Sequence, residues 1–147
     1  MTRLSIDFET ASQADLRQTG AYAYAQNPTT RVLCMAYAFD AGAVSVWREG
    51  QNFPPSVASH VRHGGAVDAW NAAFEYAVWN ETLLRQVGPS LPALGLGQLH
   101  DTMAAAAYWG LPMGLDDAAP AAGLGVQKDK TGHALMMRMN KPRHIDK

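Results

Sequence analysis

Two acidic residues, Asp7 and Glu9, stand two positions apart at the end of an alternating run, Leu4–Phe8, that is typical of a strand. Because alternate side chains of a strand point to the same face, both carboxylates are expected on one side of a sheet. Such oxygen ligands repel each other unless a cation lies between them, and they favour Mg²⁺ or Mn²⁺. By itself, the pair is more typical of a solvated strand end.

A third acid, Glu75, follows a second strand-like run, Ala66–Trp70, and falls in the first turns of a strong helical pattern. Asn71, just before that helix, is a residue type that often caps a helix N-terminus. An acid in the first turn is also favoured by the helix dipole, so Glu75 alone has an ordinary structural explanation. Glu75 indicates a functional site only in combination with Asp7 and Glu9.

The elements that must position these acids follow from periodicity. Apolar and alternating runs predict three antiparallel strands joined by hairpins, with a loop and a short helix after the first. Strands and helices alternate after that, which predicts one mixed α/β sheet flanked by helices. Asp101 is expected to cap a helix through its carboxylate. The expected strands are Leu4–Phe8, Arg31–Asp40, Val44–Trp47, Ala66–Trp70 and Leu99–His100, and the expected helices are Val57–His63, Ala72–Gln86, Thr102–Trp109 and Leu115–Ala122.

The pairing of Asp7-Phe8-Glu9-Thr10 with Asn71-Ala72-Ala73-Phe74-Glu75, in this order and context, resembles the DEDD family of 3′–5′ exonucleases. The sequence is most similar to proofreading domains of phage-type family A DNA polymerases, over nearly the whole chain. This resemblance implies a ribonuclease H-like fold for residues 1–147 as one domain. It also implies phosphodiester hydrolysis at single-stranded or frayed DNA 3′ ends, with a polymerase domain possible on a full-length chain.

The resemblance also implies particular residue roles. Asp7, Glu9 and Glu75 would hold two divalent ions, Mg²⁺ or Mn²⁺, and serve as the catalytic acids. Thr10 and Asn71 would contact the terminal nucleotide or support the metal ligands. Glu75 occupies a position at which Asp is the commoner acid of the wider family.

One part of the family pattern is missing. The third motif places a Tyr or His four or so residues before a final metal-binding Asp. Tyr108 is followed at that spacing by Pro112, and His144 precedes Asp146 by only two positions. We therefore expect the chain to end before this motif, with the C-terminal part of the fold incomplete, catalysis impaired and an apolar surface exposed that favours dimerisation or aggregation.

Composition fits an intracellular globular domain. The 147 residues are 48% hydrophobic and 17% charged, and no apolar run approaches the length that crosses a membrane. Cys34 is the only cysteine, which excludes an internal disulfide and favours a small core residue in a reducing, cytoplasmic setting. Residues 1–127 carry six Lys and Arg against eleven Asp and Glu, whereas residues 128–147 form a basic tail of six against two. This tail is either a solvated segment or a contact for nucleic-acid phosphates.

Two alternatives to a working nuclease stay open. The first is a non-catalytic nucleic-acid-binding or structural domain that kept the fold and lost turnover. The second is an unrelated α/β domain with acidic residues paired by chance, which predicts that Asp7, Glu9 and Glu75 lie far apart in space.

Overall fold

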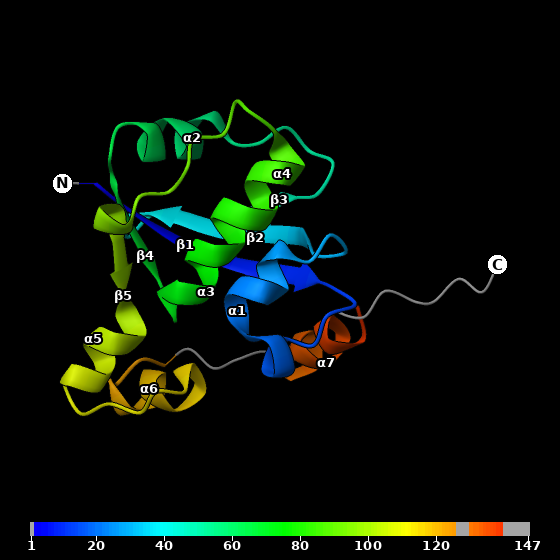
Figure 1. Ribbon diagram of the computed structural model, residues 1–147. Coiled ribbons are helices and arrows are strands. Elements are labelled where there is room, and N and C mark those ends of the chain that lie inside the picture. The colour runs from blue at the N-terminus through cyan, green and yellow to red at the C-terminus, as the bar shows by residue number, and fades with distance from the viewer. Residues whose placement is uncertain (1, 126–129, 140–147) are drawn as a thin grey trace.

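A computed structural model describes residues 2–125 and 130–139 of the chain (Figure 1). Its centre is a five-stranded mixed sheet with the strand order β3-β2-β1-β4-β5. Strands β1, β2 and β3 are antiparallel neighbours, whereas β4 and β5 run parallel to β1. The strands are β1 (Arg3–Ala11), β2 (Arg31–Phe39), β3 (Ser45–Arg48), β4 (Ala66–Ala69) and β5 (Leu99–Asp101). This α/β arrangement is consistent with a ribonuclease H-like fold and confirms the predicted fold class.

Helices connect the strands, and several of them cover one face of the sheet (Figure 1). The first, α1, lies between β1 and β2, where the sequence predicted a loop and a short helix. Gly20, with a φ of 77°, interrupts α1, a backbone conformation that glycine adopts without a steric penalty. The helices are α1 (Leu16–Gln26), α2 (Pro55–Arg62), α3 (Ala72–Ala77), α4 (Leu84–Val87), α5 (Thr102–Tyr108), α6 (Leu115–Ala121) and α7 (Lys130–Met139), with a 3-10 turn η2 (Leu96–Gln98).

The predicted helix Ala72–Gln86 is continuous but not uniform. Its middle, η1 (Val78–Leu83), is a π-helix between α3 and α4. A π-helical segment shifts the hydrogen bonds by one residue and turns the side chains that follow it. The segment contains Trp79, whose fully buried ring donates a hydrogen bond from Nε1 to Pro92 O at 2.9 Å. Apolar periodicity predicted the helix and could not reveal this shift.

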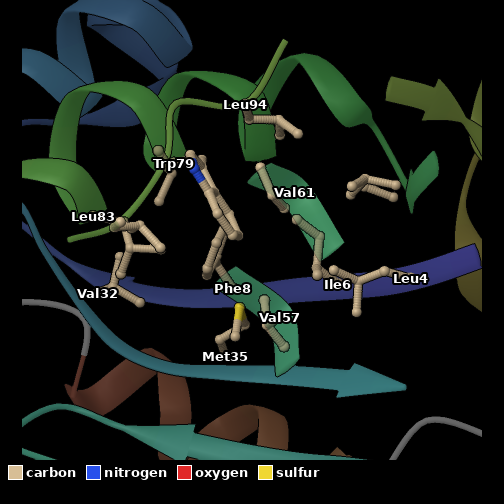
Figure 2. Packing of buried hydrophobic residues seen from close by; sticks show 14 of the residues in the cluster. Leu4, Ile6, Phe8, Val32, Met35, Val57, Val61, Trp79, Leu83 and Leu94 are labelled. Carbon is tan, nitrogen blue, oxygen red and sulfur yellow. The ribbon is translucent and has the colours of Figure 1, made fainter. Parts of the chain in front are cut away.

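The hydrophobic core lies between the sheet and the helices on one of its faces (Figure 2). Leu4, Ile6 and Phe8 of β1 are all buried on this side. Trp79 packs against Phe8, with ring centroids 6.3 Å apart. Further members of the core are Val32, Met35, Val57, Val61, Leu83 and Leu94. The core therefore holds β1 rigidly along the residues that alternate with the two acids.

The region after β5 is less well covered. Tyr108 and Trp109 are 84% and 79% exposed, and their rings contact each other edge to face. Met113, Leu115 and Leu124 are exposed as well. This is the kind of exposed apolar surface that the sequence predicted, and dimerisation through it stays a prediction.

Two predictions concern the last part of the chain. The sequence did not predict a helix in this part, but residues Lys130–Met139 form a helix, α7. In the basic tail, Arg138 is exposed, whereas Lys128, Lys141, Arg143 and Lys147 lie outside the described residues. Among the residues that the structure describes, no helix combines the length and the apolar character needed to cross a membrane.

Candidate active site

The predicted acids lie near the carboxyl ends of the parallel strands. Ser5 of β1 is level with Asp68 of β4, and Ala69 of β4 is level with Asp101 of β5. Because β4 ends at Ala69, the chain leaves the sheet beside the part of β1 that carries Asp7. Ligands of open α/β sheets commonly bind at this edge. Strand β1 continues past it to Ala11, paired with β2 alone.

Asp7 and Glu9 project from the face of β1 opposite the core. Asp7 is exposed and Glu9 half-buried, whereas Ile6 and Phe8 between them are buried. Glu9 is level with Cys34 on β2. Burial raises the pKa of the Cys34 thiol, and the negative charges of Glu9 and Asp7 raise it further, against the opposite effect of Arg48. Both carboxylates therefore act on one face of the sheet, and Cys34 is a half-buried neighbour of Glu9 rather than the core residue that the sequence predicted.

Glu75 is the most unusual residue of the group. It is 3% exposed, and its Oε2 atom is buried without a hydrogen-bond partner. Burial raises the pKa of Glu75 to about 8, although a hydrogen bond with its own backbone amide lowers it; the charges of Asp7 and Asp101 raise it further. A buried carboxylate oxygen without a hydrogen-bond partner is costly while the group is charged, so burial favours the protonated form. Asp7 and Glu75 therefore lie within electrostatic reach of each other.

Asn71 does not cap α3 in the predicted way. Its side chain makes no capping hydrogen bond, and its backbone is left-handed, with φ 62° and ψ 55°. Few residues other than glycine adopt this conformation, and Asn is among those that tolerate it best. Its carbonyl accepts from Phe74 N at 2.9 Å. The Asn71 side chain is exposed, which keeps it available to a ligand.

Thr10 faces the interior. It is buried, and its hydroxyl lies 2.8 Å from the Tyr24 hydroxyl of α1. A shift in the pairing of β1 with β2 falls between Glu9 and Thr10, where the strand has a bulge. Bulges re-aim side chains and are frequent beside functional sites. Thr10 therefore anchors the end of β1 through Tyr24, and its predicted role beside the metal ligands or the nucleotide stays a prediction.

Sequence reasoning missed one further acid. Asp101 was expected only to cap the helix that follows, and it does so by accepting hydrogen bonds from Met103 N and Ala104 N. Its other carboxylate oxygen accepts from Ala72 N, at the start of α3. A carboxylate that also raises the pKa of Glu75 belongs to the acid group. Nothing in the sequence indicated the contact between Asp101 and Ala72, because these residues are far apart along the chain.

The donor set suits a hard divalent cation, because carboxylate oxygens are the ligands that Mg²⁺ and Mn²⁺ prefer. Oε2 of Glu75 has no hydrogen-bond partner, and the charges of Asp7 and Asp101 act on the same carboxyl group, which is the observation that fits a cation best. Within residues 2–125 and 130–139, however, no group of three or more acidic, His or Cys side chains stands at the spacing that would hold an ion. The acids are near one another without forming a finished coordination shell.

The sequence is similar to that of a known protein. Over 145 residues, 97% of the chain, the sequence is 36% identical to a DNA polymerase of Bacillus phage SP02. The chain is related to a DNA polymerase. This polymerase-related chain spans 21% of the length of that relative. No protein-family model matches it.

A solved structure also matches part of the chain, but only weakly. The family B DNA polymerase of the archaeon Pyrobaculum calidifontis matches 67% of the chain and 13% of its own, with a TM-score of 0.39 and 16% identity. Values this low carry no argument about the polymerase-related chain. The relation therefore depends on the sequence match.

Proposed function

We propose that this chain is a 3′–5′ exonuclease domain of a DNA polymerase, which hydrolyses phosphodiester bonds at DNA 3′ ends with the help of divalent cations. One observation carries the proposal: the buried carboxylate of Glu75, whose Oε2 has no hydrogen-bond partner, lies within electrostatic reach of Asp7, at the carboxyl ends of the strands. The relation to a phage DNA polymerase supplies the context in which such a group of acids acts on DNA.

In this proposal, Asp7, Glu9 and Glu75 hold two cations, Mg²⁺ or Mn²⁺. Such ions supply a water of lowered pKa and stabilise the charge of a leaving oxygen. Asp7 is exposed and Glu9 half-buried, so both can reach an ion from the open face, whereas Glu75 reaches it from the helix side. Thr10 anchors the end of β1 through Tyr24, and the exposed Asn71 side chain is available to the terminal nucleotide.

Charge explains why the acids need cations to accept this substrate. A DNA end brings phosphate groups toward Asp7, Glu9 and Glu75, and like charges repel. Bound cations reverse the sign of the site and allow the phosphate to approach. The buried Glu75 also loses its proton more readily beside a cation, because an opposite charge favours the ionised form. Single-stranded or frayed 3′ ends are the expected partners, recognised through their backbone rather than their sequence.

A second candidate is a non-catalytic nucleic-acid-binding domain with the same fold. The observation that favours it is in the sequence: no Tyr or His of the 147 residues is followed four positions later by an Asp. With one acid fewer than the exonuclease family, this chain is expected to trim DNA slowly even if it binds cations.

A Mn²⁺ titration followed by electron paramagnetic resonance tests the proposal directly. We expect binding by the wild-type chain and none by Asp7→Ala. Asp68→Ala is the matched control, because it removes a carboxylate that is paired with Arg3 on the neighbouring strand. Absence of Mn²⁺ binding in the wild-type chain would refute the proposed function.

A second assay separates the two candidates. A 5′-labelled single-stranded oligonucleotide incubated with Mn²⁺ should shorten slowly from its 3′ end with the wild-type chain and not with Asp7→Ala. Cation binding without any shortening, together with retention of the oligonucleotide, would favour the non-catalytic domain.

A further inference from the structure

Two consecutive residues, Asp101 and Thr102, form hydrogen bonds with the junction between β4 and α3. Thr102 donates from Oγ1 to Ala69 O at 3.0 Å, at the last residue of β4. Asp101 accepts at Oδ2 from Ala72 N at 3.2 Å, at the first residue of α3. The two bonds therefore fix both ends of the short segment that turns the chain from the sheet into the helix.

Asp101 uses its two oxygens for two different helices. Oδ1 accepts from Met103 N at 2.9 Å and from Ala104 N at 3.1 Å, which caps α5, while Oδ2 holds the start of α3. An ionised carboxylate offers two acceptor oxygens, whereas the amide of Asn offers only one. The double use thus requires Asp, although Asn is as good as Asp for capping a single helix.

The held segment contains the left-handed residue Asn71. Its φ of 62° is unusual for a residue other than glycine, and its own side chain does not cap α3. Such conformations persist when the surroundings over-determine them, and they are concentrated at functional sites. The bonds to Ala69 and Ala72 flank Asn71 on both sides and supply that constraint.

We propose that Asp101 and Thr102 form a clamp that positions Glu75 for cation binding. Ala72 and Glu75 are three residues apart in α3, so they lie on one side of the helix and move together. Releasing Ala72 lets the first turn of α3 shift, and the position of Glu75 relative to Asp7 then changes. This inference rests on the proposed function, because it concerns the same group of acids.

The first test replaces Asp101 with Asn in the full 147-residue chain. Asp101→Asn keeps one acceptor for α5 and loses the second acceptor for Ala72. We expect an almost unchanged melting temperature and a Mn²⁺ affinity about tenfold weaker, the size of effect typical of residues that orient a metal ligand. Asp15→Asn is the matched control, since Asp15 caps α1 through Arg17 N and should leave the Mn²⁺ affinity unchanged.

The second test removes a hydrogen bond of the clamp without changing the charge of the site. Thr102→Val keeps the shape of the side chain and removes the bond to Ala69 O, and we expect Mn²⁺ affinity about tenfold below that of the wild-type chain, at the lower end of such effects. Thr82→Val is the control, because Thr82 donates to Ala25 O at 2.7 Å, another bond between residues far apart in the sequence. Thr82→Val should lower stability and leave Mn²⁺ affinity unchanged.

The outcomes separate this inference from the proposed function. A wild-type chain that binds no Mn²⁺ refutes the proposed function, and the clamp with it. Wild-type binding combined with unchanged affinity in Asp101→Asn overturns the clamp alone. Weakening by Asp101→Asn without weakening by Thr102→Val also overturns it, because the effect then comes from charge. Equal weakening by the two controls shows general destabilisation and overturns it as well.

Discussion

The two faces of β1 differ in what their residues do. On one face, Leu4, Ile6 and Phe8 are almost completely buried against helices (Figure 2). On the other, Asp7 is exposed and Glu9 half-buried beside Cys34. Alternation along one strand thus places apolar residues that stabilise the fold on one face, and the acids of the proposed function on the other. Rigidity on the first face fixes the positions of the acids on the second.

Glu75 departs from this division, because it is an acid on the buried side. Its carboxylate is as buried as a core residue, yet its Oε2 has no hydrogen-bond partner. Natural cores leave few buried polar groups unpaired, and such exceptions concentrate at functional sites. We therefore predict that Glu75, unlike its apolar neighbours, lowers the free energy of unfolding and serves to bind a cation.

The largest effect should come from the core. Trp79→Ala removes a fully buried ring that packs against Phe8 and Phe53, with centroids 6.3 Å and 5.9 Å away. We expect a loss of about 4 kcal/mol in the free energy of unfolding, as for other large-to-small core substitutions. Urea denaturation measures it, with Trp109→Ala as the control, since Trp109 is 79% exposed. Equal losses in the two variants would show that the buried face of β1 contributes no more to stability than an exposed residue does.

The next effect is a dependence of stability on pH. The pKa of Glu75, about 8 in the folded chain, lies above the unfolded value of about 4.3, so the folded state binds the proton more tightly. The stabilisation is complete below the unfolded pKa and is lost as the pH rises toward the folded one. Without cations, we expect the wild-type chain to lose about 4 kcal/mol relative to Glu75→Gln between pH 4.3 and pH 8.

Urea midpoints measured in the presence of a chelator at pH 5 and pH 8.5 test this prediction. Glu81→Gln serves as the control, because Glu81 lies further along the same continuous helix and hydrogen bonds with Gln26. The control should follow the wild-type chain at both pH values. A Glu75→Gln variant that follows it too would show that the carboxyl is solvated.

Much of the fold could be predicted from the sequence because local patterns record it. Alternation predicted β1, β3 and β4, and the caps and glycines bounded α5 and α6 to within a residue. The π-helical segment at Trp79 could not be predicted, since it depends on how a large ring packs against distant residues. The break of α1 at Gly20 depends on a backbone conformation that sequence spacing does not encode.

Some features of the candidate site could likewise be predicted from the sequence, and others could not. Asp7, Glu9 and Glu75 were predicted from spacing and resemblance, and the shared face of the first two follows from strand geometry. The burial of Glu75 was not predicted, because its place in a first helical turn had an ordinary explanation in the helix dipole. The contact of Asp101 with Ala72 was missed because it crosses from β5 to α3, and only its local cap is visible in the sequence.

A smaller effect tests the left-handed backbone of Asn71, between β4 and α3. Asn71→Ala places a poorly tolerated residue in a left-handed conformation, and we expect a loss of about 1 kcal/mol in the free energy of unfolding, whereas Asn71→Gly should be nearly neutral. Gly64→Ala provides the control: its φ is +76° and an added Cβ meets nothing within 4 Å. Both alanine variants should lose similar stability, but only Asn71→Ala should weaken Mn²⁺ binding. Loss of binding in Gly64→Ala would mean that any destabilisation disturbs the acids.

The smallest effect on stability should accompany the largest effect on binding. Asp7→Asn changes an exposed carboxylate of β1, and surface substitutions of this kind usually alter stability by less than about 0.5 kcal/mol. Because Asp7 raises the pKa of Glu75, the variant should also titrate Glu75 at a lower pH, which carbon-13 chemical shifts of the carboxyl group can follow. Mn²⁺ binding should nevertheless disappear. An Asp7→Asn chain that unfolds far more easily than the wild type would show that this face, too, is structural, and the contrast between the two faces of β1 would no longer hold.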